Sequence, residues 1–298
     1  MTNGKRVISA VVVTTLAGLL AACGSSSSSS SGSAASSASS SASYSLVTPG
    51  ELTVAVYGSY APYITVTPSG QLGGVDGALL NGFASSVGLK VHVFQTTFTS
   101  SILAVEQHKA DIGTYIYYTS QRAASVYYTL PFMSDYAVVF TLKSFPYQSP
   151  ASLSGKSVGT VQGFVWAPYL QKTFGSNAKL YPDTVTVGTA LLNGQIQGYV
   201  DGSTSQLSPP INTPKVVAHL LKAGDFGFPE SVIATIAYND VNCGNKSLAL
   251  AYDNYVRSIA QDGKFTSLVN SNVGQVESTY HVHLPSLVPA LTVPQEVC

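Results

Sequence analysis

The fold is decided by residues 51–56, ELTVAV, and by the loop YGSYAPY at 57–63 that follows them. The first segment is a short apolar run, which is typical of a buried strand, and the loop is rich in turn residues and aromatics. Apolar residues then recur at helical spacing up to Gly88, and residues 89–94 alternate as a strand. A second short helix is expected around 102–105. The order strand, helix, strand, helix predicts a parallel sheet flanked by helices.

The same pattern repeats in the second half of the chain. Residues 157–161, SVGTV, indicate a strand, which is followed by a helix through 169–170 and by a strand and helix that lead to the apolar pair 199–200. Another apolar strand is expected at 233–238, and a long amphipathic helix at 248–259. The sequence therefore predicts two α/β lobes.

The N-terminus has the pattern of a bacterial export signal. Lys5 and Arg6 precede an apolar run at 7–20, which closes with Leu-Ala-Ala-Cys at Cys23. The run is shorter than the roughly 20 apolar residues that a membrane-spanning helix needs. Because the closing motif resembles a lipobox, we predict that residues 1–23 are a lipoprotein signal peptide and that Cys23 is lipidated. The alternative is a buried helix that ends in an incidental cysteine.

The following segment and the overall charge limit the function further. Residues 24–48 are mostly Ser, Ala and Gly, which offer little apolar surface to offset the entropy of ordering, so they predict a disordered tether. The formal net charge is +0 and only 9% of residues are charged. The chain therefore has no basic face for nucleic acid, and we expect contact with the membrane only through the lipid anchor.

Two further cysteines, Cys243 and Cys298, are expected to form a disulfide, because an exported protein meets an oxidising exterior. The bridge would close a loop of about 55 residues, which the chain-entropy model values at about 4 kcal/mol. The alternative is two free thiols.

Several short segments match a known set of motifs in order and spacing. They are Leu52–Tyr63, KAD at 109–111, TSQR at 119–122, TLPF at 129–132, LSGKSVG at 153–159, and NG at 193–194 followed by YVD at 199–201. Together they resemble the family 3 extracellular solute-binding proteins, from Gly50 to about Tyr280. The resemblance implies an α/β, type II periplasmic-binding fold: two lobes, each a mostly parallel sheet flanked by helices, with a hinge and an interlobe cleft.

The resemblance also implies a function and a domain layout. The N-lobe would comprise residues 49–144 plus 238–298, and the C-lobe residues 145–237. The protein would be a monomer that captures a small polar ligand, an amino acid or related carboxylate, and delivers it to the permease of an ABC importer. It would be held on the outer face of the cell membrane by its lipid.

Residues matching the family's motifs provide a candidate ligand site. Arg122 would bind the ligand's carboxylate with its planar guanidinium, assisted by the Thr119 hydroxyl. Tyr60 follows a parallel strand, where ligand contacts are common, and could stack on the ligand beside Tyr63. Asp201, from the other lobe, would bind an ammonium. The alternatives are a surface ion pair for Arg122, core packing for both tyrosines and a turn or helix cap for Asp201.

Two aromatic residues depart from the family pattern. Tyr117 stands where the family has a small hydroxyl residue that touches the amino group. Phe164, after Gly163, replaces a threonine that assists the carboxylate, although backbone N–H groups at a helix start there could do the same. The sequence therefore leaves open whether the ligand carries an α-amino group.

Rival functions have weaker signals. Residues 155–159, GKSVG, fit the Gly-x-Ser-x-Gly pattern of hydrolases but lack its strand-turn-helix context. His281 and His283 indicate a solvated tail rather than a metal site. We expect no cofactor, no metal and no enzymatic activity. The remaining alternatives are an exported ligand sensor of a signalling system and a dehydratase-like enzyme on the same fold, which would need a general acid or base in the cleft.

Overall fold

The computed structural model describes residues 44–271 and Cys298. Its strands are β1 (Glu51–Val56), β2 (Thr65–Val66), β3 (Leu72–Gly73), β4 (Lys90–Gln95), β5 (Ile112–Tyr117), β6 (Val126–Tyr128), β7 (Met133–Leu142), β8 (Val158–Val161), β9 (Ala178–Tyr181), β10 (Gly198–Gly202), β11 (Val216–Leu220) and β12 (Ala234–Asn242). Its α-helices are α1 (Gly74–Ser86), α2 (Phe98–Glu106), α3 (Ala167–Phe174), α4 (Thr184–Leu192) and α5 (Lys246–Gln261). Every strand and helix named in the sequence analysis is confirmed.

The sheet has two regions, each with parallel strands at its centre. In the first, β1 pairs in parallel with β4 and β5, and β12 pairs with β5 in antiparallel orientation. In the second, β8 pairs in parallel with β9 and β10, and β7 joins β10 and β11 in antiparallel orientation. We call the part built on β1, β4, β5 and β6 the N-lobe and the part built on β8 to β11 the C-lobe.

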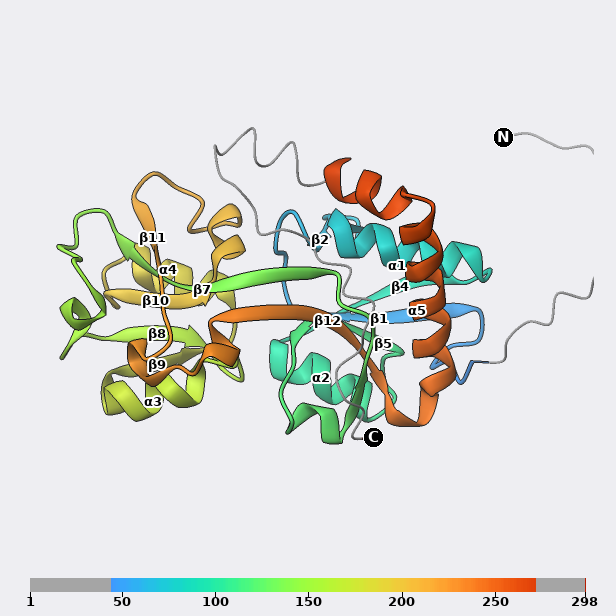
Figure 1. Ribbon diagram of the computed structural model, residues 1–298, viewed down its shortest axis with the longest axis horizontal. Helices are drawn as coiled ribbons and strands as arrows, with labels where there is room; N and C mark the ends of the chain where they lie inside the picture. The colour runs from blue at the N-terminus through green and yellow to red at the C-terminus, as the bar shows by residue number, and fades with distance from the viewer. Residues whose placement is uncertain (1–43, 272–297) are drawn as a thin grey trace, which may run out of the picture. The chain divides into compact units, whose positions relative to one another are not determined.

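Strands β7 and β12 connect the two lobes, and Figure 1 shows them side by side between the labelled strands of each lobe. The first residues of β7 pair with β12, whereas Ala137 and the residues after it pair with β10 and β11. The chain therefore passes into the C-lobe within β7 and returns within β12. These two strands form the backbone hinge of a two-lobe fold.

Apolar faces attach the helices to the sheet. On α1, Leu79, Leu80 and Phe83 are fully buried at helical spacing, and the amphipathic α5 packs beside it (Figure 1). Helix α2 lies on the other side of the N-lobe sheet. Its N-cap is Thr97, whose side chain accepts a hydrogen bond from the Ser100 N–H. This cap fixes where α2 begins, at the edge of the cleft.

The ordered body begins before Pro49. The carbonyl oxygen of Ser45 lies 2.7 Å from Nε2 of His108 and accepts a hydrogen bond from the Asn245 side chain at 2.9 Å. The Val47 N–H donates to the buried Asp111 carboxylate at 2.8 Å. The last residues of the segment predicted to be a disordered tether are therefore bound to the N-lobe, because their backbone polar groups find partners there.

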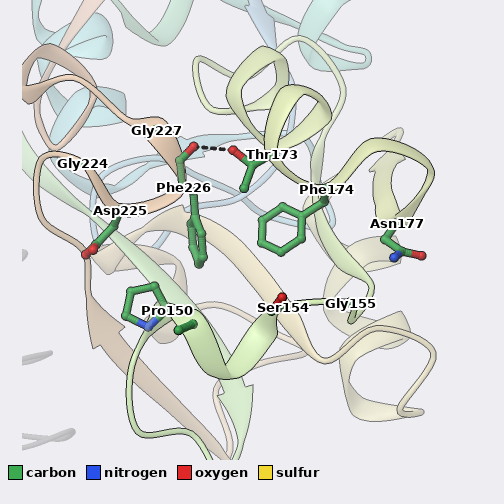
Figure 2. Close-up of a pocket in the computed structure, with 11 residues that line it drawn as sticks. Pro150, Ser154, Gly155, Thr173, Phe174, Asn177, Gly224, Asp225, Phe226 and Gly227 are labelled. Carbon is green, nitrogen blue, oxygen red and sulfur yellow. Dashed lines mark hydrogen bonds between the residues drawn. The ribbon is translucent and has the colours of Figure 1, made fainter.

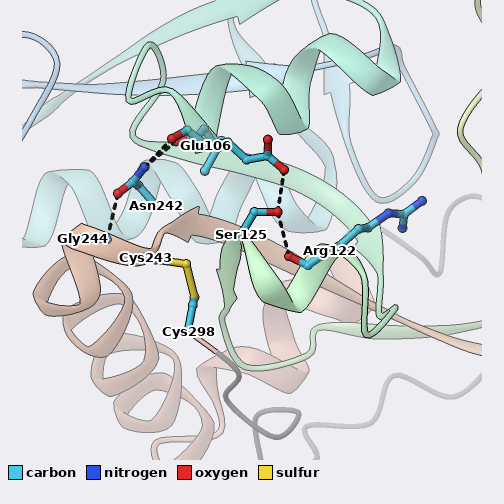
Figure 3. The surroundings of a disulfide bond; sticks show 8 residues. Glu106, Arg122, Ser125, Asn242, Cys243, Gly244 and Cys298 are labelled. Carbon is cyan, nitrogen blue, oxygen red and sulfur yellow. Dashed lines mark hydrogen bonds between the residues drawn. A yellow bond between two sulfur atoms is a disulfide. The ribbon is translucent and has the colours of Figure 1, made fainter.

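A disulfide lies beside the end of α2. The structure joins Cys243 to Cys298, with the two Cα atoms 5.7 Å apart (Figure 3). The preceding Asn242 donates to the backbone carbonyls of Val105 and Glu106 at 3.0 and 2.8 Å, and so satisfies carbonyls at the end of that helix. The last residue of the chain is thereby attached to the N-lobe.

Candidate ligand-binding site

The cleft between the lobes contains a small inner cavity. Its lining residues are Tyr57, Phe98, Tyr115, Tyr117 and Arg122 from the N-lobe and Phe164, Val165 and Asp201 from the C-lobe. The volume open to the centre of a water-sized sphere is about 10 Å³, which is room for about one water molecule. The site is closed in this conformation, so a larger ligand enters only when the lobes separate.

Two open grooves share lining residues with this cavity. One, of about 730 Å³, runs between α2 and α3 and includes Arg122, Gly163 and Phe164. The other, of about 410 Å³, lies beside the hinge strand β12 and includes Tyr117 and Val165. The expected interlobe cleft is therefore present, and four of the predicted residues, Tyr117, Arg122, Phe164 and Asp201, line its inner cavity.

Arg122 reaches across the cleft. It begins a short 3₁₀ helix, and its guanidinium donates to the carbonyl oxygens of Tyr117 at 2.7 Å and Gly163 at 2.8 Å. Its Cζ atom lies 4.9 Å from the centre of the Phe98 ring. Partial burial lowers the pKa of Arg122 from its ordinary value, but a guanidinium stays charged. No described residue forms an ion pair with it, and the buried Asp240 carboxyl interacts with it electrostatically over a longer distance.

Thr119 holds the backbone of Arg122 in place. Its hydroxyl accepts a hydrogen bond from the Arg122 N–H at 3.1 Å and thereby fixes the turn that carries the guanidinium. Thr119 lines both grooves but not the inner cavity.

Tyr60 and Tyr63 are buried, with relative exposures of 3% and 0%. Tyr60 stacks on Tyr115 at 5.2 Å between ring centres, so the structure places both tyrosines one layer behind the cavity wall.

Asp201 lines the cavity, but its carboxylate is held within the C-lobe. One oxygen accepts from the Gly202 N–H at 2.8 Å, and the other accepts from the Tyr199 hydroxyl. Burial raises the pKa of Asp201 to about 7, although the Tyr199 hydrogen bond opposes this shift. Both carboxyl oxygens therefore accept a hydrogen bond within the C-lobe, and burial favours the neutral form of the group.

The two unusual aromatic residues fill the site. Tyr117 packs edge-on against Trp166, at 5.7 Å between ring centres, and Phe164 packs edge-on against Phe98, at 4.8 Å. The Phe164 N–H donates to the Val161 carbonyl oxygen at 3.2 Å, and α3 begins three residues later. The amide that we expected at a helix start thus closes a turn instead.

Gly163 is where the two lobes approach most closely. Its φ is +86°, and a Cβ atom there would lie 2.8 Å from Thr99 Oγ1 and 3.2 Å from the Phe98 ring. Only glycine fits both the backbone conformation and the space. Its carbonyl oxygen is then free to accept from Arg122 across the cleft.

Asp135, on the hinge strand β7, is the main polar residue that sequence reasoning missed. Its carboxylate accepts from the hydroxyls of Tyr115 and Tyr117 in the N-lobe, at 3.2 and 3.3 Å, and from Ser203 and Thr204 in the C-lobe. The Tyr136 N–H adds a further contact at 2.8 Å. Burial raises the pKa of Asp135, while the Ser203 and Thr204 hydrogen bonds oppose this shift. One carboxylate thus connects both lobes to the hinge.

Tyr115 adopts a strained backbone conformation at this point, with φ of +56°. A bulky residue in the left-handed region costs free energy, and such residues concentrate at functional sites. The surroundings hold it: Tyr57 donates to its carbonyl oxygen, and the Asn239 side chain accepts from its N–H at 3.3 Å. The cavity wall is therefore held in place by contacts from several strands.

Other lining residues had weaker signals in the sequence. Tyr57 is the first residue after β1, at the carboxyl end of a parallel strand, where ligand contacts are common. This position after β1 could have identified Tyr57 as a cavity-lining residue from the sequence alone. Phe98, Tyr115 and Val165 carry no such signal, because each is an ordinary apolar residue of a helix, strand or turn.

A separate pocket of about 440 Å³ lies within the C-lobe, away from Arg122 (Figure 2). Phe174 and Phe226 meet edge-on in its wall, at 5.2 Å between ring centres, and the Thr173 hydroxyl donates to the Phe226 carbonyl oxygen at 2.7 Å. The one carboxylate in the lining, Asp225, accepts from the Lys222 N–H at 2.7 Å. None of the residues predicted to bind a ligand lines this pocket.

Some predictions fall outside the described residues: Cys23, residues 1–23, most of the tether, and the pair His281 and His283. Within 44–271 and Cys298, no cluster of three or more His, Cys, Asp or Glu side chains could hold a metal ion. Over the same residues, no helix has the length and apolar character needed to cross a bilayer.

Two α/β lobes, a two-strand hinge and a cleft that holds an arginine define a hinged ligand-binding protein. The sequence profile of bacterial extracellular solute-binding proteins, family 3, matches residues 52–275, and the chain belongs to this family. The predicted family and two-lobe fold are thereby confirmed. None of the curated proteins matches the chain in sequence.

Solved structures share the fold at low sequence identity. The substrate-binding protein of an amino acid ABC transporter is 18% identical, with a TM-score of 0.67, over 76% of this chain and 100% of that one. A mutant of ArgBP from T. maritima is also 18% identical, with a TM-score of 0.65, over 76% and 96%. A histidine kinase sensor domain with similarity to periplasmic binding proteins is 17% identical, with a TM-score of 0.63, over 75% and 96%.

Proposed function

We propose that this chain captures a small polar ligand, an amino acid or related carboxylate, outside the cell and delivers it to the permease of an ABC importer. The observation that carries the proposal is the guanidinium of Arg122, which lies in the cleft and contacts both lobes. Family membership and the likeness to a substrate-binding protein of an amino acid transporter support it. We further propose that the protein acts as a monomer.

The proposed site combines Arg122 and Thr119 from the N-lobe with groups of the C-lobe. The C-lobe groups are Gly163, Phe164 and Asp201. Tyr117 shapes the cavity, and Tyr60 and Tyr63 support its wall. A ligand favours closure only through contacts that the open state lacks. Arg122 reaches the C-lobe at Gly163 in the closed state, so a carboxylate bound to Arg122 would contact both lobes only when they are together.

Thermal-shift screening of amino acids and simple carboxylates tests ligand capture directly. A compound that raises the unfolding temperature should also change the fluorescence of Trp166, the one tryptophan in the chain, whose ring lies 5.7 Å from that of Tyr117. Affinity capture from membranes, with the ligand present, tests the partner. Recovery of a permease supports the proposal, and recovery of a sensor kinase in its place contradicts it.

The second candidate is an exported sensor that binds the same ligand and reports it to a signalling partner. The likeness to a histidine kinase sensor domain favours it. Both candidates use the same cleft, so they differ in the partner and not in the site. Deleting the chain should abolish uptake of labelled ligand if it serves an importer. A sensor would leave uptake intact and alter gene expression instead.

Lipid attachment at Cys23 gives a separate prediction. Replacing Cys23 with serine should remove the acceptor thiol and release the protein from the membrane fraction into the medium. Metabolic labelling with an alkyne fatty acid should mark the wild type and not the variant. A Cys298→Ser variant is the matched control, because it loses a thiol elsewhere and should remain labelled. Equal labelling of Cys23→Ser and the wild type would rule out this anchor.

The Cys243–Cys298 disulfide should stabilise the mature protein by constraining the unfolded chain. The two residues are 55 positions apart, and a loop of that length gives about 4 kcal/mol in the chain-entropy model. We therefore expect Cys298→Ser to lower the unfolding temperature, and the wild type to show the same loss after reduction. Mass spectrometry that finds two free thiols in the exported protein would contradict the pairing.

A further inference from the structure

We propose that the ligand of this cleft is a small carboxylate that carries no ammonium group and has an apolar or aromatic body. The inference rests on the proposed function, because it names the ligand class for the same site. It follows from an asymmetry in the cleft: opening the lobes frees one side of the cation, whereas both oxygens of Asp201 and of Asp135 keep at least one hydrogen-bond donor.

Arg122 becomes available when the lobes separate. One of its two hydrogen bonds, to the Tyr117 carbonyl oxygen, lies within the N-lobe, and the other crosses to Gly163 in the C-lobe. Separation breaks the second bond and turns that side of the guanidinium toward the cleft. The fork geometry of a guanidinium suits bidentate contact with a carboxylate. The cleft therefore offers a ready site for an anion.

Asp201 remains occupied in the open state, because its hydrogen-bond donors belong to its own lobe. Tyr199 is two residues earlier on the same strand, and Gly202 is the next residue. Tyr199 is fully buried and packs against Phe140, at 5.5 Å between ring centres, so its ring has no room to swing away. Burial also raises the pKa of Asp201 to about 7, which weakens it as a counter-ion. Each oxygen of Asp201 therefore already accepts from a fixed donor, which an ammonium would have to share.

Asp135 cannot take the place of Asp201 as the counter-ion of an ammonium group. Its two oxygens accept from Tyr115, Tyr117, Tyr136, Ser203 and Thr204, which already exceeds the usual capacity of a carboxylate. A Cβ atom at Gly202 would lie 2.2 Å from Asp135 Oδ2 and 2.9 Å from the Tyr117 hydroxyl oxygen, so the packing around it is tight. Opening can remove the donors of only one lobe, so both oxygens keep a partner: Tyr136 on Oδ1, and either Thr204 or the two tyrosines on Oδ2.

The rest of the lining favours a neutral, apolar body. Tyr57, Phe98 and Phe164 present rings to the cavity and pack edge-on against one another, with centres 4.7 to 6.2 Å apart. Such faces bind planar or apolar groups, and the one cation that lies over them in this structure is Arg122, over Phe98. A carboxylate with a hydrocarbon or aromatic tail fits both the guanidinium and the rings that line the cavity.

Matched pairs of compounds test this inference on the purified protein. We compare 3-phenylpropanoate with L-phenylalanine and 4-methylpentanoate with L-leucine, by calorimetry and by Trp166 fluorescence. The member without the amino group should bind about tenfold more tightly or better in at least one pair. Asp201→Asn should change the affinities of the two members of a pair by the same factor, because neither uses an ammonium contact there, and the exposed control Asp262→Asn should change neither by more than about twofold. Arg122→Ala should weaken it by about thirtyfold or more.

The outcomes separate the two proposals. If the amino acids bind more tightly and Asp201→Asn weakens them about tenfold or more, the ligand-class inference is overturned while ligand capture by the cleft stands. If the compounds bind but Arg122→Ala leaves every affinity unchanged, the proposed site itself is wrong. If no compound of either pair binds, the inference is also overturned, and the wider thermal-shift screen then decides whether ligand capture stands.

Discussion

Replacing Arg122 with alanine should nearly abolish ligand binding while leaving the protein folded. Removing one partner of a buried charged contact costs about 2–5 kcal/mol of binding free energy. Arg122 is one of only two arginines in the described residues, and the one that lines the cleft cavity. Calorimetry with the tightest ligand from the screen gives the affinity, and circular dichroism verifies the fold.

Two further variants separate charge from geometry. Arg122→Lys keeps a positive charge but loses the planar fork, so it should recover only part of the affinity. Arg257→Ala removes the other arginine, which lies on α5 away from the cleft, and should bind as the wild type does. Full affinity in Arg122→Ala for every ligand found would show that the carboxylate site lies elsewhere.

The protein should be more stable in mild acid than at neutral pH. Burial raises the pKa of Asp76, Asp201 and Asp240 from 3.8 to about 7 in each case. Asp240 is the clearest case, because neither of its oxygens has a hydrogen-bond partner from another described residue. The folded protein therefore holds these protons more tightly than the unfolded chain does.

The sign of the effect follows from linkage. A carboxyl whose folded-state pKa is raised contributes its stability fully below the unfolded pKa, near 4. That contribution is lost as pH rises from about 4 to about 7. At about 1.4 kcal/mol per pKa unit, the three groups together should change the free energy of unfolding by several kcal/mol. His219 opposes the trend at the acid end, because burial lowers its pKa.

Denaturant unfolding at pH 4, 5.5 and 7 measures this dependence. The free energy of unfolding should fall across the series, and Asp240→Asn should flatten the fall because an amide carries no titrating proton. Asp262→Asn, a change at an exposed carboxylate, should leave the slope unchanged. A wild-type stability that rises between pH 4 and pH 7 would contradict the assignment of protonated, buried carboxyls.

Much of the architecture was predictable because it depends on local pattern. Strand β1 is apolar along nearly its whole length, and α1 buries Leu79, Leu80 and Phe83 on one face, so burial is encoded by spacing. The hinge was located less directly, through the lobe boundaries that the family resemblance implies near residues 144 and 238. Strand β7 is a single continuous strand, and nothing in its sequence marks the change of pairing partners at Ala137.

The site was predictable only in part. The motif around Arg122 was sufficient to place a cation in the cleft, because a short segment fixes both the turn and the side chain that it carries. The same approach suggested Tyr60 as a contact. The structure instead puts Tyr57 in the cavity wall and Tyr60 behind it, because the strained Tyr115 lies between Tyr60 and the cleft.

The sequence by itself determined two α/β lobes, the family, and an arginine at their junction, since all three depend on residues close together in the chain. The tertiary structure decided what the junction can bind. Asp135 meets Ser203 across 68 positions of sequence, and Arg122 meets Gly163 across 41. Whether a carboxylate is free or already satisfied depends on such distant donors. Only the folded chain brings these donors within hydrogen-bonding distance.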